Sequence, residues 1–165
     1  MAKRLDKHNY YLGIAEQVAT NATCLRRRYG SVIVKNDEII STGYNGSPRG
    51  TCNCTDIGFC ARQKLNIAPG ERYEKCRSVH SEMNAIISAS RKDMIGSTLY
   101  LVGIEADTNK LSQYHMPCTM CQRAILNSGV ETVVMKTGKS TYKIMHREMF
   151  IVENKNELDI LTKEE

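Results

Sequence analysis

The chain has 165 residues, of which 41% are hydrophobic and 25% are charged, and these proportions are typical of a soluble globular protein. They exclude disordered and fibrous architectures, and the length predicts a single domain over residues 1–165. The formal net charge of +5 is concentrated in the first third, which suits an anionic substrate or a solvated charged surface. No apolar run is long enough to span a bilayer, and no apolar segment of signal-peptide length follows Met1, so we expect a cytoplasmic protein.

The first half of the chain predicts a helix, a hairpin and a long insert. Apolar residues at helical spacing predict an amphipathic helix over about residues 5–20. Residues 31–35 and 38–44 are rich in β-branched side chains, and the turn-forming pair Asn36-Asp37 separates them, which predicts a β-hairpin. Regular periodicity is lost over about residues 45–78, a cysteine-rich insert whose length is typical of a functional loop.

The second half alternates between helical and strand patterns. This alternation predicts an α/β fold, a three-layer α/β/α sandwich around a central mixed, mostly parallel five-stranded sheet. The predicted elements are a helix over 80–92, a strand over 98–102, a helix from Pro117 to Ser128, a strand over 130–136, a helix over 142–149, a short strand over 150–152 and a final helix from Asn156.

Two cysteines and one histidine form a candidate metal site. Cys118 and Cys121 are three residues apart at the start of a predicted helix, so both sulfurs project from one face of its first turn. His80 opens another predicted helix, and the partial positive charge of a helix N-terminus favours the thiolate form of nearby cysteines. Two thiolates and one imidazole suit zinc and leave its fourth position for water, as in a catalytic site.

Glu82 lies two residues beyond His80, where its carboxylate can sit beside the metal and transfer protons. His-x-Glu followed by Pro-Cys-x-x-Cys is the signature of zinc deaminases, which attack C4 of cytosine or C6 of adenine. A structural zinc knuckle needs a second Cys-x-x-Cys pair, which the chain lacks. The pattern therefore predicts a hydrolytic deaminase with Glu82 as the catalytic residue and His80, Cys118 and Cys121 as metal ligands.

Residues 5–137 resemble the cytidine and deoxycytidylate deaminases, and most closely the deoxycytidylate (dCMP) branch. The resemblance is carried by residues 29–34 (Tyr-Gly-Ser-Val-Ile-Val), residues 43–50 (Gly-Tyr-Asn-Gly-Ser-Pro-Arg-Gly) and residues 80–86 (His-Ser-Glu-Met-Asn-Ala-Ile). The common motif of the family is His-Ala-Glu, and Ser81 replaces the alanine here. Because serine is also small, we expect activity to survive this change.

The resemblance implies zinc-dependent hydrolysis of dCMP to dUMP and ammonia, a step that supplies dTMP synthesis. It implies that Glu82 protonates N3 and then the departing amine, that Asn45 contacts the sugar, and that Tyr142 lies near the substrate. Gly46, Pro48 and Arg49 are candidates for binding the phosphate of the substrate or of an effector. Further phosphate candidates, which the sequence leaves unranked, are Arg26, Arg27, Arg28, Arg123 and Lys143.

The resemblance also implies a homohexamer that dCTP activates and dTTP inhibits. The insert adds a second metal candidate, since four of its cysteines are either ligands of a structural zinc ion or buried free thiols. These residues are Cys52, Cys54, Cys60 and Cys76.

Three alternatives remain. A tRNA adenosine deaminase, or another nucleobase deaminase of the superfamily, would use the same metal residues, but the Gly-Ser-Pro-Arg-Gly loop and the long insert argue against it. A zinc-stabilised nucleic-acid-binding module without activity would have no use for Glu82 beside the metal, and the chain has two phenylalanines and no tryptophan for base stacking. We therefore expect a nucleotide as ligand, and neither a nucleic acid nor a membrane as partner.

Overall fold

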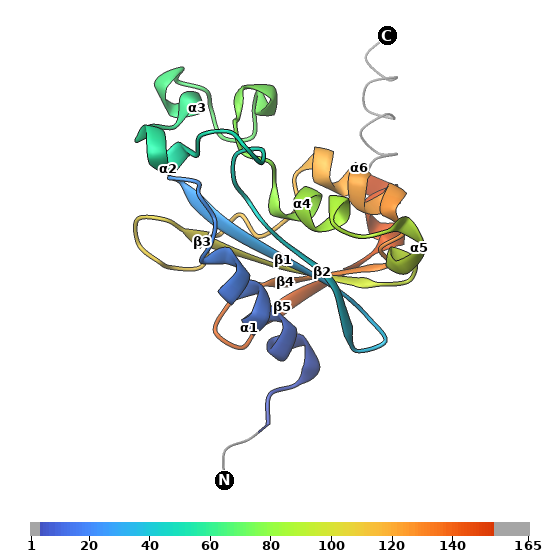
Figure 1. Ribbon diagram of the computed structural model, residues 1–165. Helices are drawn as coiled ribbons and strands as arrows, with labels where there is room; N and C mark the ends of the chain where they lie inside the picture. The colour runs from blue at the N-terminus through green and yellow to red at the C-terminus, as the bar shows by residue number, and fades with distance from the viewer. Residues whose placement is uncertain (1–3, 154–165) are drawn as a thin grey trace.

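The computed structural model describes residues 4–153, which form a sheet between two helical layers (Figure 1). The final helix predicted from Asn156 lies outside the described residues. In chain order the elements are α1 (Lys7–Ala19), β1 (Arg27–Lys35), β2 (Glu38–Tyr44), α2 (Cys54–Ile57), α3 (Ala61–Lys64), a 3-10 turn (Tyr73–Lys75), α4 (Ser81–Ile87), α5 (Arg91–Met94), β3 (Thr98–Glu105), α6 (Thr119–Ser128), β4 (Thr132–Lys136), β5 (Tyr142–His146) and a helical segment over 147–153.

The sheet has five strands in the order β2-β1-β3-β4-β5. The mixed five-stranded sheet flanked by helices is therefore as predicted, but the expected majority of parallel pairs is not found. Among the described strands only β3 and β4 run parallel, and the other three pairings are antiparallel. The reason is that two of the connections, β1 to β2 and β4 to β5, are hairpins, and only the β3-α6-β4 unit crosses over through a helix to a parallel neighbour.

The predicted hairpin is present, and its first strand begins earlier than predicted. Asn36 and Asp37 both have positive φ angles, 52° and 65°, which are the backbone angles of a tight hairpin turn. Strand β1 begins at Arg27, because this charged start of the strand pairs with the end of β3, where Arg27 lies opposite Glu105.

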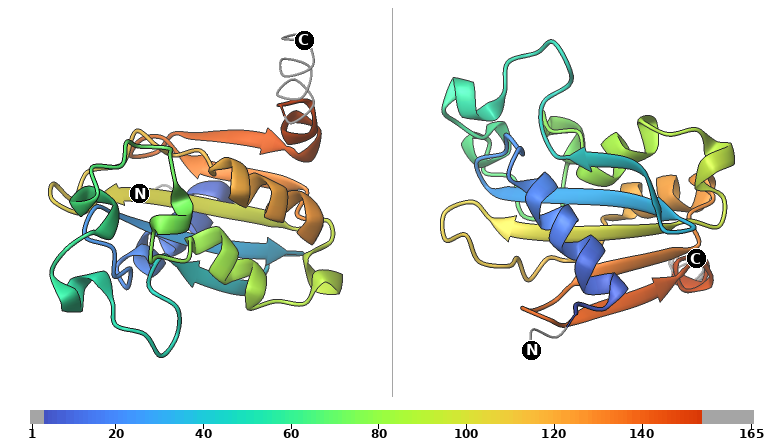
Figure 2. Two further views of the ribbon diagram at one scale, coloured as in Figure 1. Left: turned by 90° about the horizontal axis from the view of Figure 1, so that it is seen from above. Right: turned by 60° about the horizontal axis from the view of Figure 1, so that its bottom comes forward.

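The two faces of the sheet carry different helices (Figure 2). Each face also has its own hydrophobic core. Helix α1 covers one face, where Leu12 and Ala15 pack against Val32 and Val102. Helices α4, α5 and α6 cover the other face, above the sheet in Figure 1. Among residues 4–153, no helix combines the length and the apolar character needed to cross a membrane.

Two glycines allow the helices to lie directly on the sheet. A Cβ atom at Gly30 would lie 2.0 Å from the carbonyl oxygen of Ala15 in α1. A Cβ atom at Gly43 would lie 2.3 Å from the carbonyl oxygen of Ser81 and 2.4 Å from the amide nitrogen of Ala85, both in α4. Real Cβ atoms do not approach so closely, so the glycine in β2 sets the position of α4.

Gly43→Ala is therefore expected to destabilise the protein by about 1–3 kcal/mol, because the added methyl group forces α4 away from the sheet. Urea unfolding followed by circular dichroism measures the effect. The control is Gly13→Ala on α1, where a Cβ meets nothing within 4 Å, and which is expected to stabilise the helix by roughly 0.4–1 kcal/mol. Equal unfolding midpoints for the two variants would contradict this account of α4.

The C-terminal part of the described chain differs from the prediction. Residues 142–146 form strand β5 where a helix was predicted, and residues 150–152 are helical where a short strand was predicted. Strand β5 is stabilised by antiparallel pairing with β4, from Thr132 opposite His146 to Lys136 opposite Tyr142. The apolar run that looked like a strand instead places Phe150, fully buried, in the core under α4 and α6. The helix predicted over 80–92 divides into α4 and α5.

Candidate active site

His80 and the two cysteines lie at the N-termini of two helices on the same face of the sheet. His80 is the N-cap of α4 and has an extended backbone conformation, with φ −70° and ψ 153°. The residue before it, Val79, forms an isolated antiparallel bridge with Gly46. Backbone hydrogen bonds therefore connect the segment that precedes His80 to the residues that follow β2. Cys118 is the N-cap of α6, and Cys121 is buried in the first turn of that helix.

The donor atoms fit a zinc ion. The Nδ1 atom of His80 lies 3.4 Å from the sulfur of Cys118 and 3.4 Å from the sulfur of Cys121. All three donor atoms lie within 4.8 Å of one another. Two ligands of one tetrahedral zinc, at about 2.1 Å for nitrogen and 2.3 Å for sulfur, are about 3.5 Å apart. The predicted ligand set is thus assembled from residues far apart in the sequence.

The pKa values of the two thiols shift in opposite directions. A hydrogen bond from Cys121, together with one from His80, lowers the pKa of the Cys118 thiol to about 4. The hydrogen bond to Cys118 and burial both raise the pKa of Cys121. A divalent cation between the two sulfurs would supply the attraction that makes both of them thiolates.

Glu82 lies in the first turn of α4 and is only 4% exposed. Burial raises the pKa of its carboxyl group above the ordinary value. The hydroxyl of Ser81 donates a hydrogen bond to Oε2 of Glu82 over 3.1 Å, and the Ser81 and Ser31 hydroxyl oxygens are 2.8 Å apart. The serine that replaces the family's alanine therefore links the carboxylate to strand β1.

A cavity of about 270 Å³ opens beside these groups. Its wall includes His80, Glu82 and Cys118 from the metal site, and a larger set of residues from β1, the insert and the loop before α6. That larger set contains Cys24, Arg26, Arg27, Tyr29, Asn45, Cys60, Arg62, Pro69, Gly70, Tyr73, Cys76, Ser78, Ser81, Tyr114 and Met116. A buried carboxylate next to three metal donors, in a hollow of this size, is an arrangement that can perform proton transfer on a small bound substrate.

Asn45 lines this cavity and is 6% exposed. Its Oδ1 accepts a hydrogen bond of 2.6 Å from the backbone N–H of Tyr29, and its Nδ2 donates one of 2.9 Å to the carbonyl of Arg27. These bonds use one donor and one acceptor position of the amide, so one of each remains for a ligand. The side chain predicted to contact the sugar is therefore fixed at the cavity wall by strand β1.

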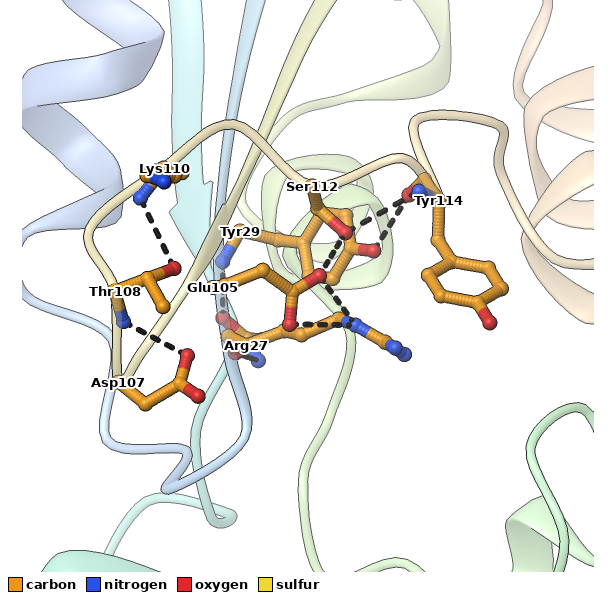
Figure 3. A network of polar contacts seen from close by, with 9 residues as sticks. Arg27, Tyr29, Glu105, Asp107, Thr108, Lys110, Ser112 and Tyr114 are labelled. Carbon is orange, nitrogen blue, oxygen red and sulfur yellow. Dashed lines mark hydrogen bonds and ion pairs between the residues drawn. The ribbon is translucent and has the colours of Figure 1, made fainter.

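A polar network fixes the neighbouring wall (Figure 3). Nε of Arg27 lies 2.9 Å from Oε1 of Glu105, and Ser112 donates a hydrogen bond to the same carboxylate. The Arg27 guanidinium carbon is 3.9 Å from the centre of the Tyr114 ring. Burial raises the pKa of Tyr29 to about 12, so its hydroxyl stays neutral and donates a hydrogen bond of 2.6 Å to the Tyr114 carbonyl. The network attaches the loop that leads to Cys118 to strand β1.

Several predicted binding residues do not line the cavity. Tyr142 is in β5 and packs with α1 on the opposite face of the sheet, where its ring centre is 5.0 Å from that of His8. Pro48 and Arg49 are exposed in a turn after β2, and the Gly46 backbone is engaged with Val79. Tyr142 is therefore not brought to the metal site within one chain, and Arg49 is not a wall residue.

The other phosphate candidates divide in the same way. Arg26 and Arg27 line the cavity, whereas Arg28 points to the α1 side and donates a hydrogen bond to Asn109. Arg27 and Arg28 face opposite sides of the sheet because successive side chains alternate along β1. Arg123 is exposed on α6, and the exposed Lys143 lies against Met116.

Cys24, which precedes the insert and was not among its predicted metal ligands, lines the cavity together with the insert cysteines Cys60 and Cys76. Burial raises the pKa of the Cys54 thiol, and the electrostatic influence of those three cysteines raises it further. Cys52, in contrast, is exposed. In residues 4–153, however, only the donor atoms of His80, Cys118 and Cys121 form a group within 4.8 Å, so the insert sulfurs would have to move closer together to bind an ion.

Sequence reasoning also missed Tyr73 and Arg62 of the insert. The Tyr73 ring packs edge to face on His80, with ring centres 5.3 Å apart. The guanidinium of Arg62 lies over the Tyr73 ring, with its Cζ atom 4.7 Å from the ring centre. Neither residue belongs to a periodic pattern, and nothing in the local sequence signals that the insert folds back over His80.

Comparisons with known proteins agree with this site. Residues 5–137 match the family model for the cytidine and deoxycytidylate deaminase zinc-binding region. The chain is 35% identical to a deoxycytidylate deaminase of Mycobacterium phage D29, over 79% of this chain and 94% of the phage protein. It is 33% identical to the deoxycytidylate deaminase of Schizosaccharomyces pombe over 79% of this chain, but spans only 37% of that longer protein.

A solved structure shares the fold. The dCMP deaminase of cyanophage S-TIM5, crystallised in complex with dCMP and dUMP, aligns with a TM-score of 0.55 and 25% identity over 80% of this chain and 82% of the phage chain. The family model covers the hairpin, His80, Glu82 and both metal cysteines. The protein is therefore a zinc-binding deaminase of the cytidine and deoxycytidylate deaminase family.

Proposed function

We propose that this deaminase hydrolyses dCMP to dUMP and ammonia in a zinc-dependent reaction. The proposal is carried by the buried carboxylate of Glu82 beside three zinc donors, in a cavity whose wall contains three arginines and no acidic residue other than Glu82. A cationic wall suits a substrate with a phosphate group. The names of the phage and yeast relatives, and the dCMP and dUMP bound to the cyanophage enzyme, support the choice of nucleotide.

The residues of this chain divide the reaction between them. His80, Cys118 and Cys121 would hold zinc, which supplies Lewis-acid activation of a water molecule. Glu82 accepts a proton from the attacking water and delivers it to N3 of the cytosine ring, while the water oxygen forms a bond to C4. Glu82 then carries the second proton to the amino group, which leaves C4 as ammonia. Water and dCMP are consumed, and dUMP and ammonia are formed. Asn45 orients the sugar, and Ser81 orients Glu82.

Ammonia release tests this proposal directly. Zinc-quantified protein is expected to release ammonia from dCMP, with dUMP as the second product on chromatography, and to lose this activity when a chelator removes zinc. Deoxycytidine, dCTP and a tRNA anticodon stem-loop are offered side by side. Release from the stem-loop alone would favour a tRNA adenosine deaminase, and zinc binding without any release would favour a binding module.

Regulation and assembly form a second part of the proposal. The resemblance to the dCMP branch supports activation by dCTP, inhibition by dTTP and a homohexamer. Rates with and without each nucleotide, and the mass in solution by light scattering, test these properties. The structural zinc predicted for Cys52, Cys54, Cys60 and Cys76 also stays a prediction, and the exposure of Cys52 counts against that residue as a ligand. Zinc content near two ions per chain would support it.

A further inference from the structure

The charges on the cavity wall are unbalanced. Arg26, Arg27 and Arg62 line the cavity, and Glu82 is the one acidic residue of that lining. Arg27 is neutralised by its ion pair with Glu105. In the part of the chain that the structure describes, no ion pair joins Arg26 or Arg62 to a carboxylate. Two uncompensated guanidinium groups therefore border the space beside the metal donors.

Arg62 is the more unusual of the two because it is buried. Arg62 is only 6% exposed, although it is on the short helix α3 of the insert. One terminal nitrogen, NH2, donates hydrogen bonds of 2.7 Å to the carbonyl of Ala68 and 2.6 Å to that of Glu71. The buried Nε has no hydrogen-bond partner among the described residues. A guanidinium stays charged, so its burial without a counter-charge is costly unless an anion binds there.

Arg62 lies close to the metal donors, with the Tyr73 ring between its guanidinium and His80. Its Cζ atom lies 4.7 Å from the centre of the Tyr73 ring, and that ring contacts His80 with a centre-to-centre distance of 5.3 Å. The guanidinium is thus one aromatic ring away from a metal ligand. In a nucleotide, the sugar separates the base from the 5′-phosphate by a similar spacing. A base whose C4 faces the metal donors can therefore place its phosphate near Arg62.

We infer that Arg62 binds the 5′-phosphate of the substrate and makes the enzyme select a nucleotide over a nucleoside. Arg26, which also lines the cavity, contributes a second positive charge. The two backbone carbonyls and the Tyr73 ring hold the guanidinium in place, which leaves its remaining N–H groups for the anion. This inference rests on the proposed function and adds to it a role for the insert, which supplies the phosphate ligand.

Arg62→Ala tests the inference, with Arg62→Lys as the conservative variant. We expect kcat/KM for dCMP to fall by about 10- to 100-fold in Arg62→Ala, mainly through KM, because a charge-assisted hydrogen bond to the phosphate is lost. Deoxycytidine has no phosphate, so its kcat/KM should stay within about twofold of wild type. Arg62→Lys should fall between wild type and Arg62→Ala for dCMP. Calorimetry provides a second measurement, in which Arg62→Ala weakens binding of dUMP by the same factor.

Lys64→Ala is the matched control. Lys64 is on the same short helix and carries the same charge, but it is exposed, does not line the cavity and lies over the Phe59 ring. Its removal should leave kcat/KM for dCMP within about twofold of wild type. Zinc content and the thermal unfolding midpoint are measured for each variant, so that unfolding of the insert is recognised.

The alternative role for Arg62 is structural, as a positive charge near Cys76 that partly offsets the rise in the pKa of this thiol caused by its burial. In that case Arg62→Ala would lower activity on dCMP and deoxycytidine equally, with loss of zinc or a lower unfolding midpoint, and the inference would be overturned. Unchanged kcat/KM for dCMP and unchanged dUMP affinity in Arg62→Ala would overturn it as well. If the wild-type enzyme itself releases no ammonia from dCMP, the proposed function fails instead, which separates the two failures.

Discussion

Glu82→Gln is expected to lower kcat for dCMP by about 10²- to 10⁴-fold while zinc stays bound. The amide has nearly the shape of the carboxylate and can still accept the hydrogen bond from Ser81, but it cannot take a proton from water and pass it to N3 or to the leaving amine. The three metal donors do not include Glu82, so the ligand set is unchanged. Ammonia release and elemental analysis on the same preparation measure both quantities.

The control for this variant is Ser81→Ala, which removes the hydroxyl that orients Glu82 but leaves the carboxylate. Its effect on kcat should be no more than about tenfold, the scale of one hydrogen bond. Glu82→Gln protein that retains its zinc and turns over dCMP at a rate within tenfold of wild type would rule out Glu82 as the proton carrier.

Cys121→Ala is expected to remove one zinc ion per chain and to abolish measurable deamination. Cys121 is fully buried at the first turn of α6, with its sulfur 3.4 Å from Nδ1 of His80, and no other described sulfur can replace it in that group. With one thiolate and one imidazole left, the site loses a charged ligand and most of its affinity for zinc. Zinc per chain by elemental analysis, before and after dialysis, tests the expectation.

Met120→Ala is a suitable control for the cysteine variant. Met120 is the preceding residue on α6, is 47% exposed and offers no ligand in the group of donor atoms. It should keep both zinc and activity. If Cys121→Ala protein loses one zinc ion per chain but still holds another, the remaining ion indicates a second site, for which the insert cysteines are the candidates. If its zinc content equals that of the wild type, Cys121 is not a ligand of the catalytic ion.

Local sequence patterns predict where the candidate metal donors lie. His80, Cys118 and Cys121 are at helix N-termini, and the residues that start a helix are recognisable from short stretches of sequence. The hairpin around Asn36 and Asp37 is equally local, since both residues tolerate the positive φ angles of its turn. Strands β3 and β4 are recognisable as apolar runs because both of their faces are covered by helices.

Patterns that depend on partners distant in the chain are not predictable in this way. Residues 142–146 form a strand because β4 supplies an antiparallel neighbour, and residues 150–152 belong to a helical segment whose Phe150 packs in the core. Short apolar runs are compatible with either structure until their contacts are known. The parallel share of the sheet was overestimated for the same reason, since strand order is a property of the whole chain.

The sequence by itself determined the deaminase family and the candidate metal donors, because one histidine, two cysteines and a glutamate have a characteristic spacing at two helix starts. Only the tertiary structure decided which other residues face that chemistry. It moved Tyr142 to the opposite face of the sheet, left Arg49 in solvent, and brought Arg62 from the insert to the cavity wall. The physical reason is that a side chain's surroundings depend on how distant segments pack, whereas helix starts and turns depend on neighbours along the chain.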